Sequence, residues 1–412
     1  MRKSSVMLTA ALVAVCFGIA VDFSMGEQPD PAATGGPATK ATAPAGEAVM
    51  SPAHRAKADK LIRDGIQWLL SQREADGGWS LGKGVAKPAI TAMVLKAFVR
   101  HAGHDPDHPI VKKGFEVLLR YKQKDGGFYD PKQGQQNYTT AVAVMALVAA
   151  RNPKFQKDID DAVKYLKGLQ IVPGSESPDG QEIDKDHPFS GGVGYGEHGR
   201  PDLSNLGMWM QALHDAGIQG DDPAMQRALV FVTRTQNLSE TNVRPWAKIG
   251  ANDGGFVYAP AIRGNLDMGE SKAEMNPGGR GLRSYGSMTY TGFKSLLYAA
   301  VDRKDPRVRA AFRWIQVHWR LDSNPNMPAL RSKEGLYYYY HVFAKALRAW
   351  GEPVITDRKG GKHNWREELI DTLASQVGKD GHWENDSPRW YERMPVLSTS
   401  YGVLALQEAL RE

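Results

Sequence analysis

The residues best suited to acid–base chemistry lie in a glycine-rich segment near the middle of the chain. Residues 191–196 (GGVGYG) are followed at once by Glu197, His198, Arg200 and Asp202. A histidine and nearby carboxyl groups can exchange protons with a bound substrate, so Asp202 and His198 are the candidate catalytic residues. Asp202 is the better candidate acid, because it stands at the expected start of a buried helix. The alternative is a surface turn in which Asp202 only caps that helix.

A second set of candidates could bind a ligand. Arg280 and Arg283 lie in a glycine-rich stretch before a helix start, where backbone N–H groups and two arginines could hold a phosphate or carboxylate; an ordinary loop is the alternative. Aromatic faces near other helix starts could contact a lipid, a sugar or a carbocation, and helix packing is the alternative. The candidate ligand contacts are Tyr195, Arg200, Asn205, Arg280, Arg283, Tyr285, Tyr290, Tyr337, Tyr340, His341, Trp390 and Tyr401.

An internal repeat indicates how these residues are positioned. The motif Asp-Gly-Gly-Trp at 76–79 returns at 125–128 (DGGF), 191–193 (GGV), 253–256 (DGGF) and 380–383 (DGHW). Glycine permits a sharp turn with positive φ after a helix, and the following aromatic residue can bury a large apolar area. One spacing is double the others and contains Gly335-Leu336-Tyr337, so we count six repeat units.

Each unit contains two helical patterns of different polarity. Residues 58–69 carry an apolar face and a charged face, as in a half-exposed helix, whereas residues 141–150 are apolar all round, as in a fully buried one. Alternation of the two types predicts an all-α chain of six helical hairpins, closed into an α/α toroid (α6/α6 barrel) with the second helix of each pair inside. The starts of the inner helices then meet at one end of a central cavity.

This repeat resembles that of the prenyltransferase and squalene-cyclase superfamily, the terpenoid cyclase/protein prenyltransferase α/α toroids, over nearly all of residues 53–410. The resemblance implies the toroid, but triterpene cyclases, protein prenyltransferase β subunits and non-enzymatic thioester domains share that fold. Residues 158–161 spell the Asp-x-Asp-Asp of class II cyclases, yet they fall at the start of an outer helix, where we expect them to face water. Asp202 occupies the position, though not the motif, of the cyclase proton donor.

Metal binding is not expected. The prenyltransferases hold zinc through Asp, Cys and His, but the one cysteine here is Cys16, in the N-terminal segment. His101, His104 and His108 have a spacing that could bind zinc, but they lie in a Pro/Gly-containing turn that fits a solvated loop better. We therefore predict no metal and no cofactor.

The N-terminus predicts export. Arg2 and Lys3 precede an apolar run at 6–21, as in a secretory signal peptide ending near residue 26. Residues 27–50 are rich in Pro, Ala, Gly and Thr and read as a disordered linker, which leaves 51–412 as the toroid domain. Formal charge is +6 with acidic and basic residues interspersed, so we expect no nucleic-acid partner and no stable membrane span after signal cleavage. Oligomeric state is left open.

Together these patterns predict an exported terpene cyclase-like protein with a central cavity for a hydrophobic or amphipathic small molecule, in which Asp202 would start acid-initiated isoprenoid chemistry. One alternative is a non-catalytic binding module for a lipid, peptide or glycan. Another is a glycan-active α/α barrel that uses Asp202 with Glu197 or Glu392, for which two carboxyl groups ~5–10 Å apart would be needed.

Overall fold

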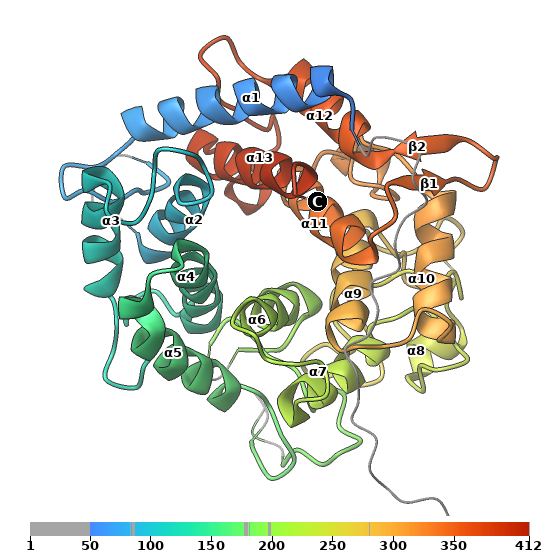
Figure 1. The fold of residues 1–412 in the computed structure, drawn as a ribbon. Helices are drawn as coiled ribbons and strands as arrows, with labels where there is room; N and C mark the ends of the chain where they lie inside the picture. Colours follow the sequence, from blue (N-terminus) through green and yellow to red (C-terminus); the bar gives the residue numbers. More distant parts are fainter. Residues whose placement is uncertain are drawn as a thin grey trace, which may run out of the picture. The chain divides into compact units, whose positions relative to one another are not determined.

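Six helical hairpins form two concentric rings in the part of the chain that the structure describes (Figure 1). The structure is a computed structural model that describes residues 50–82, 84, 87–176, 180, 182–196, 199–279 and 281–411, within a compact unit spanning Ala48–Glu412. The expected signal peptide and all but the last residue of the expected linker lie outside the described residues. The outer ring is α1 (Pro52–Ser71), α3 (Pro109–Leu119), α5 (Gln156–Gly168), α7 (Pro223–Arg234), α10 (Pro306–Val317) and α12 (Trp365–Gln376). The inner ring is α2 (Pro88–Phe98), α4 (Gln136–Ala150), α6 (Leu203–Asp215), α9 (Gly286–Tyr298), α11 (Leu336–Trp350) and α13 (Pro395–Ala409).

The last hairpin packs against the first, so the ring is closed: α13 contacts both α1 and α2. This confirms the predicted all-α toroid of six hairpins. Shorter elements decorate the loops, namely α8 (Pro245–Lys248), the 3-10 helices Pro153–Phe155, Ala329–Arg331 and Arg389–Tyr391, and the antiparallel pair β1 (Val354–Thr356) and β2 (Lys362–Asn364), in which Ile355 pairs with His363.

The repeated glycines set how one unit packs on the next. The first glycine of each turn has positive φ at Gly77, Gly126, Gly191, Gly254 and Gly381. A Cβ at Gly126 would lie 2.7 Å from the Asp161 carbonyl oxygen on α5, and one at Gly191 would lie 2.0 Å from that of Arg227 on α7. Only glycine fits here, because the turn of one hairpin touches the outer-helix backbone of the next. The same contact between Gly381 and Asp64 of α1 helps to close the ring.

The residue after each of the five glycine turns is buried, and in four of them its backbone is bonded to an inner helix. The backbone N–H of Trp79 donates to Thr91 Oγ1 at 3.0 Å, and that of Phe128 donates to Thr140 Oγ1 at 2.9 Å. Equivalent bonds join Phe256 to Thr289 at 3.1 Å and Trp383 to Thr399 at 3.0 Å. Four of the hydroxyls near the inner-helix starts therefore hold the repeat together. Gly335 is different, because it immediately precedes α11 with φ 66° and forms no such turn.

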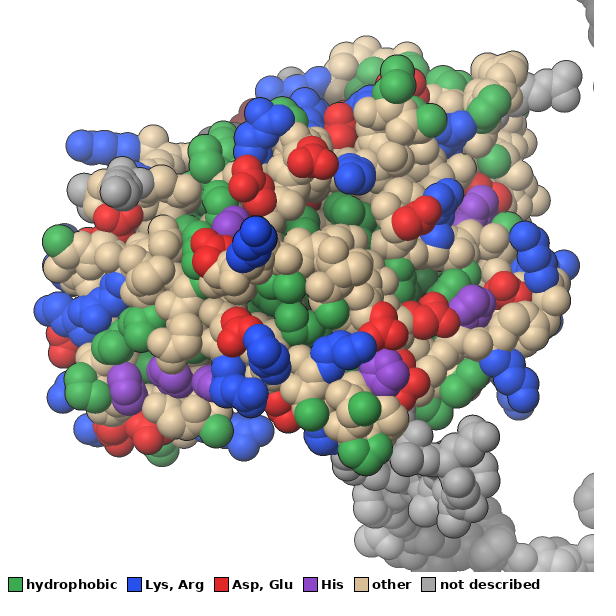
Figure 2. Space-filling model, turned by 90° about the horizontal axis from the view of Figure 1, so that it is seen from above, with side chains coloured by type: hydrophobic (Ala, Val, Ile, Leu, Met, Phe, Trp, Pro, Cys, Tyr) green, Lys and Arg blue, Asp and Glu red, His purple; other side chains and the backbone are tan. Residues whose placement is uncertain are grey.

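The surface carries charges of both signs. Figure 2 shows Lys and Arg side chains interspersed with Asp and Glu over the face that it presents. Of the helices that the structure describes, none combines the length and the apolar character that a membrane crossing requires.

Candidate functional site

Asp202 lies at the start of inner helix α6 and is almost completely buried, with 2% of its surface exposed. Its Oδ1 accepts the backbone N–H of Asn205 at 2.9 Å, which is the usual helix N-cap contact. Its Oδ2 accepts the Asn205 side-chain amide at 2.8 Å. Burial raises the pKa of Asp202 above its ordinary value, against the opposing effect of these hydrogen bonds. The carboxyl group is thus a helix cap whose neutral form is favoured by burial.

A chain of phenol groups connects Asp202 with the surface. The Tyr258 side chain is hydrogen-bonded to Asp202, and the Tyr195 side chain is hydrogen-bonded to those of Tyr258 and Asn205. Tyr195 is 43% exposed, so the chain runs from a buried carboxyl group to solvent. Tyr258 was not among the site residues predicted from the sequence. Its place two residues after the buried Phe256, just beyond a repeat turn, could have indicated it.

Arg200 does not contact Asp202 through a hydrogen bond in the described structure. Its guanidinium forms an ion pair with Glu270, which also pairs with Lys272. Lys272 Nζ lies 4.4 Å from the centre of the Tyr258 ring and Arg200 Cζ lies 5.8 Å from it. Both cations therefore cover the outer face of the phenol that holds Asp202.

Three tyrosines meet across the axis of the ring, close to the Asp202 end. The hydroxyl groups of Tyr138 on α4 and Tyr401 on α13 are 3.1 Å apart. The Tyr338 hydroxyl, from α11, lies 3.2 Å from Ser204 Oγ on α6 and 3.4 Å from Thr291 Oγ1 on α9. The Tyr338 and Tyr401 rings lie edge to face with centres 6.0 Å apart. Aromatic faces and hydroxyls from five inner helices thus gather at one place.

The other tyrosines of the inner helices that were predicted as ligand contacts do not face the axis of the ring. The Tyr337 hydroxyl donates to Gln376 Oε1 at 3.2 Å, and the Gln376 amide donates to the Tyr340 hydroxyl at 2.8 Å, so both face outer helix α12. Tyr290 packs in the core against Tyr339 and Phe343. Successive helical residues point about 100° apart, which is why Tyr338, rather than Tyr337 or Tyr340, faces the axis.

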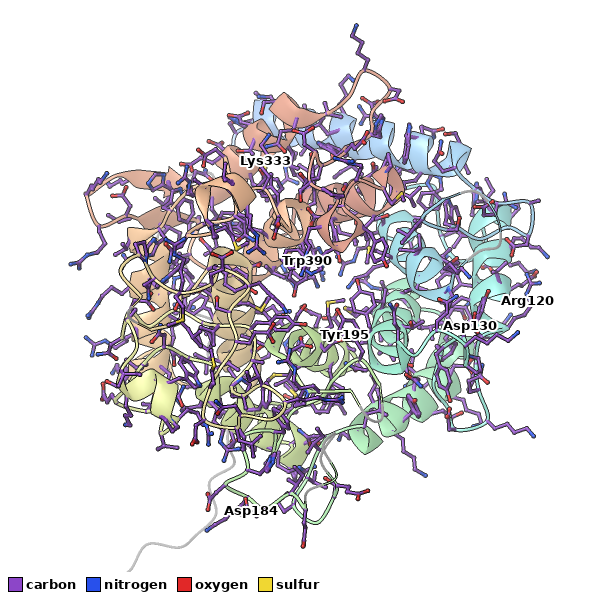
Figure 3. The ribbon with its side chains drawn as sticks, turned by 180° about the vertical axis from the view of Figure 1, so that it is seen from behind. Arg120, Asp130, Asp184, Tyr195, Lys333 and Trp390 are labelled. Carbon is purple, nitrogen blue, oxygen red and sulfur yellow. The ribbon has the colours of Figure 1, made fainter. Side chains whose placement is uncertain are left out.

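The remaining selected residues fall into three groups. Tyr195 and Trp390 lie beside the centre of the ring in the view of Figure 3, and the Trp390 ring packs over Gly335 at the start of α11. Tyr285 and His341 are buried, whereas Arg283 is half-buried in the loop before α9. His198, Arg280 and Glu197 lie outside the described residues.

Comparisons with known proteins bear on the fold. The chain is 31% identical to drimenyl diphosphate synthase from Streptomyces showdoensis over 109 residues, which are 26% of this chain and 20% of that relative. The type II terpene cyclase MstE from Scytonema has a similar structure, with a TM-score of 0.50 and 12% identity over 86% of this chain and 99% of that chain. No family model matches the sequence.

Glycan-active proteins share the fold as well. The α-1,6-mannanase GH76A of Salegentibacter sp. HEL1_6, solved as an inactive variant with α-1,6-mannotriose, has a TM-score of 0.51 and 11% identity over 85% of this chain and 99% of that chain. D-mannose isomerase has a TM-score of 0.51 and 12% identity over 88% of this chain and 99% of that chain. These likenesses establish the fold, and the local sequence match to drimenyl diphosphate synthase covers a fifth of that relative's length.

The chain has the α/α-toroid fold.

The Asp-x-Asp-Asp sequence lies on the outside of the toroid, as expected. Lys122 Nζ bonds Asp158 at 2.6 Å and Asp161 at 2.7 Å, and Asp160 is exposed with Gln156 as its partner at 2.8 Å. These carboxylates belong to outer helix α5, and Asp161 also pairs with Lys157. Asp202, by contrast, is buried at the start of inner helix α6.

The toroid holds a second buried carboxyl group at the same end. Glu392, with 1% of its surface exposed, accepts the backbone N–H groups of Tyr338 at 2.8 Å and Tyr337 at 3.2 Å, and the Asn385 amide at 2.6 Å. Burial raises the pKa of Glu392 to about 7. Because α11 begins after a glycine and lacks a cap of its own, Glu392 caps that helix from a distant loop and holds Tyr338 at the axis.

The three histidines considered as a zinc site lie next to one another in a turn, with their rings tilted. The ring centres of His101 and His104 are 5.5 Å apart, and those of His104 and His108 are 5.1 Å apart. Among the described residues, no group of three or more His, Cys, Asp or Glu side chains has the arrangement of a metal site.

Proposed function

We propose that this chain is an exported, terpene cyclase-like protein that binds an isoprenoid or other lipid at the ring axis, and that Asp202 protonates it. The observation that carries the proposal is a buried carboxyl group with a raised pKa, placed at an inner-helix start beside phenol groups. A carboxyl group must keep its proton in order to donate it to a weak base such as an alkene, and burial favours the neutral form.

The surrounding groups fit the later steps of such a reaction. Proton transfer from Asp202 to a carbon–carbon double bond would leave a carbocation on the substrate and a carboxylate on the protein. Faces of Tyr138, Tyr338 and Tyr401 could stabilise the cation by cation–π attraction. The cation would then lose a proton to form a new alkene, and the Tyr195–Tyr258 chain offers a route by which Asp202 regains its proton from solvent.

A non-catalytic binding module is the second candidate. Both oxygens of Asp202 already accept hydrogen bonds from Asn205, so the residue can be fully explained as a cap. In that case the tyrosine cluster binds a lipid, peptide or glycan without turnover. The glycan-active alternative is less well supported, because Glu392 is committed to capping α11 and Glu197 lies outside the described residues.

The decisive experiment measures ligand and turnover together. The mature protein is purified, its bound small molecules are extracted for mass spectrometry, and it is incubated with squalene, geranylgeranyl diphosphate and α-1,6-mannotriose. We expect a cyclised product from an isoprenoid with wild type and with Asp160→Asn, and none with Asp202→Asn.

Other outcomes select between the candidates. Binding of an isoprenoid without product, unchanged in Asp202→Asn, would support the non-catalytic module. Cleavage of the mannotriose would support the glycan-active alternative. Turnover of an isoprenoid by Asp202→Asn at the wild-type rate would exclude Asp202 as the proton donor.

A further inference from the structure

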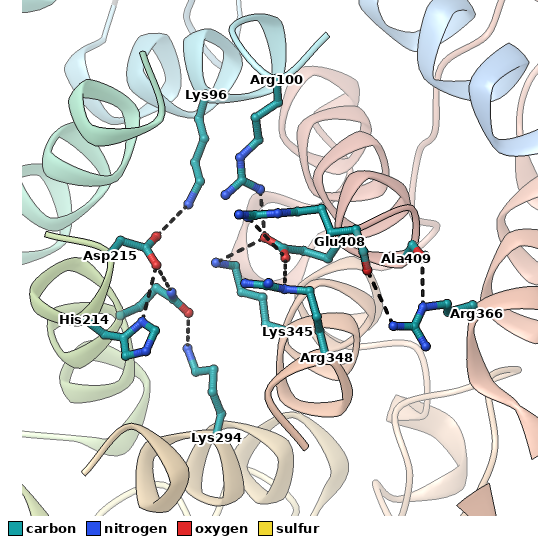
Figure 4. A network of polar contacts seen from close by, with 12 residues as sticks. Lys96, Arg100, His214, Asp215, Lys294, Lys345, Arg348, Arg366, Glu408 and Ala409 are labelled. Atoms are coloured by element: carbon teal, nitrogen blue, oxygen red, sulfur yellow. Dashed lines mark hydrogen bonds and ion pairs between the residues drawn. The ribbon is translucent and has the colours of Figure 1, made fainter. Parts of the chain in front are cut away.

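The carboxyl ends of the inner helices hold a cluster of buried cations, at the opposite end of these helices from Asp202. Figure 4 shows Lys96, Arg100, Lys294, Lys345 and Arg348 reaching toward one another. They come from three of the inner helices, α2, α9 and α11, with Arg100 two residues beyond the end of α2. Lys294 is 1% exposed, and the side chains of Lys96 and Lys345 are each 3% exposed. Groups of like charge are costly to bury together unless something compensates them.

Two carboxylates supply part of that compensation. Asp215 Oδ2 lies 3.3 Å from Lys96 Nζ. Glu408, 1% exposed, lies 2.7 Å from Arg100 Nη1, 2.6 Å from Arg348 Nε and 3.7 Å from Lys345 Nζ. Among these described residues, five cationic side chains thus face two carboxylates. Lys294 has only neutral hydrogen-bond partners, the Gln211 side chain at 3.0 Å and the Gly207 carbonyl at 3.4 Å.

A separate observation shows that hydrogen-bonding capacity is unused beside this cluster. His341 lies one helical turn before Lys345 on α11, is 4% exposed, and its Nδ1 has no hydrogen-bond partner among the described residues. Burial lowers the pKa of His341, and the nearby Lys345 and Lys96 lower it further. A buried nitrogen with no partner normally signals a missing one.

We propose that Lys96, Lys294, Lys345, Arg100 and Arg348 form a binding site for a phosphate-type oxyanion at the carboxyl end of the inner ring. Arg100 and Arg348, whose side chains are 16% and 29% exposed, form its outer edge and admit the anion. The three lysines lie deeper. Burial lowers the pKa of each, and an anion bound beside them would favour their charged forms. An oxyanion with several acceptor oxygens suits this set, because ammonium and guanidinium groups each donate to phosphate.

The proposal does not depend on the function proposed for the Asp202 end, since it uses different residues. The anion could be free phosphate or diphosphate, or the diphosphate head group of an isoprenoid. In the rival explanation, the carbonyl groups at the inner-helix carboxyl ends, with their partial negative charge, hold the cations without any ligand.

Calorimetric titration of the full mature protein with inorganic diphosphate, at constant ionic strength, tests the proposal. We expect saturable binding at one site. Lys294→Met and Lys345→Met keep most of the side-chain volume and remove a buried charge, so they should fold and weaken binding at least tenfold. Lys157→Met is the matched control, because Lys157 is 83% exposed on the outer ring, and should bind like wild type.

The outcomes separate the explanations. No saturable heat with wild type, or equal affinity in wild type, Lys294→Met and Lys345→Met, would overturn the proposal and leave the helix carbonyls as the explanation. If the lysine variants fail to fold by circular dichroism, Arg348→Gln at the more exposed edge provides the same comparison. Farnesyl diphosphate that binds at least tenfold more tightly than inorganic diphosphate, with no binding of farnesol, would identify a lipid head group; equal affinities would identify the free anion.

Discussion

Replacement of Asp202 by asparagine should separate its role as a cap from its role as an acid. In Asp202→Asn the new side-chain oxygen can still accept the Asn205 N–H, since asparagine caps as well as aspartate. The new amide would face the Asn205 amide, which now donates at 2.8 Å. That clash can be relieved, because Asn205 Oδ1 has no hydrogen-bond partner in the described structure and rotation of the Asn205 amide would present it as an acceptor.

The expected stability change at pH 7 is therefore small, within about 1 kcal/mol of wild type. Asp202→Ala is the contrasting variant. It loses the cap, which costs about 1–2 kcal/mol, and removes the hydrogen bond that Asp202 forms with the Asn205 amide and the one that it forms with the Tyr258 side chain, which costs about 0.5–1.5 kcal/mol for each bond. Urea unfolding followed by circular dichroism measures both variants under the same conditions.

The pH dependence of the free energy of unfolding should differ between wild type and Asp202→Asn in a known direction. Burial raises the pKa of Asp202 in the folded state, so the folded protein holds the proton more tightly than the unfolded chain does. Wild type therefore loses stability as pH rises from the unfolded pKa of about 3.9 to the higher folded pKa, and Asp202→Asn lacks this loss. The stability of Asp202→Asn relative to wild type should increase from pH 4 to pH 7. Destabilisation by more than about 2 kcal/mol at pH 7 would refute the reasoning, because it would mean that the fold depends on the ionised carboxylate.

Three further predictions follow from the same structure. Trp79→Ala removes a fully buried ring whose Nε1 donates to the Leu69 carbonyl at 2.7 Å, so it should lower the free energy of unfolding by about 3–5 kcal/mol. Thermal unfolding measures this loss, and a loss under 1 kcal/mol would contradict the role of the buried aromatic residue in the repeat. Burial lowers the pKa of Lys294 to about 7, so the unfolded chain binds this proton more tightly and wild-type stability should rise from pH 7 toward pH 10. Lys294→Met should show a smaller rise and be at least as stable as wild type at pH 7; a pH profile of stability identical to that of wild type would contradict this prediction. If the protein is exported, mass spectrometry of protein collected from the cell exterior or periplasm should find a mature N-terminus near residue 27. Cytoplasmic protein with an intact Met1 would contradict this prediction.

The repeat and the toroid could be predicted from the sequence because they depend on local rules. A glycine turn, a buried residue after it and alternating helix polarity are all read within one unit of chain, and the structure explains the glycines by contacts that recur between neighbouring units. The position of Asp202 at the start of an inner helix followed from the same rules. So did the placement of the Asp-x-Asp-Asp sequence on outer helix α5, since its apolar neighbours define the buried face.

The partners of the site residues were decided by the tertiary structure alone. Tyr258 reaches Asp202 from a different loop, Glu392 caps α11 from the next hairpin, and Tyr138 meets Tyr401 across 263 positions of sequence. The rotation of α11 that turns Tyr338 to the axis depends on helix packing, which no local pattern records. The cation cluster is the clearest case: Lys96 and Arg100 look like ordinary polar residues at helix ends, and only closure of the ring brings them to Asp215 and Glu408. Contacts between distant units carry no periodic signal along the chain, because burial and charge there depend on which helices the closed ring sets side by side.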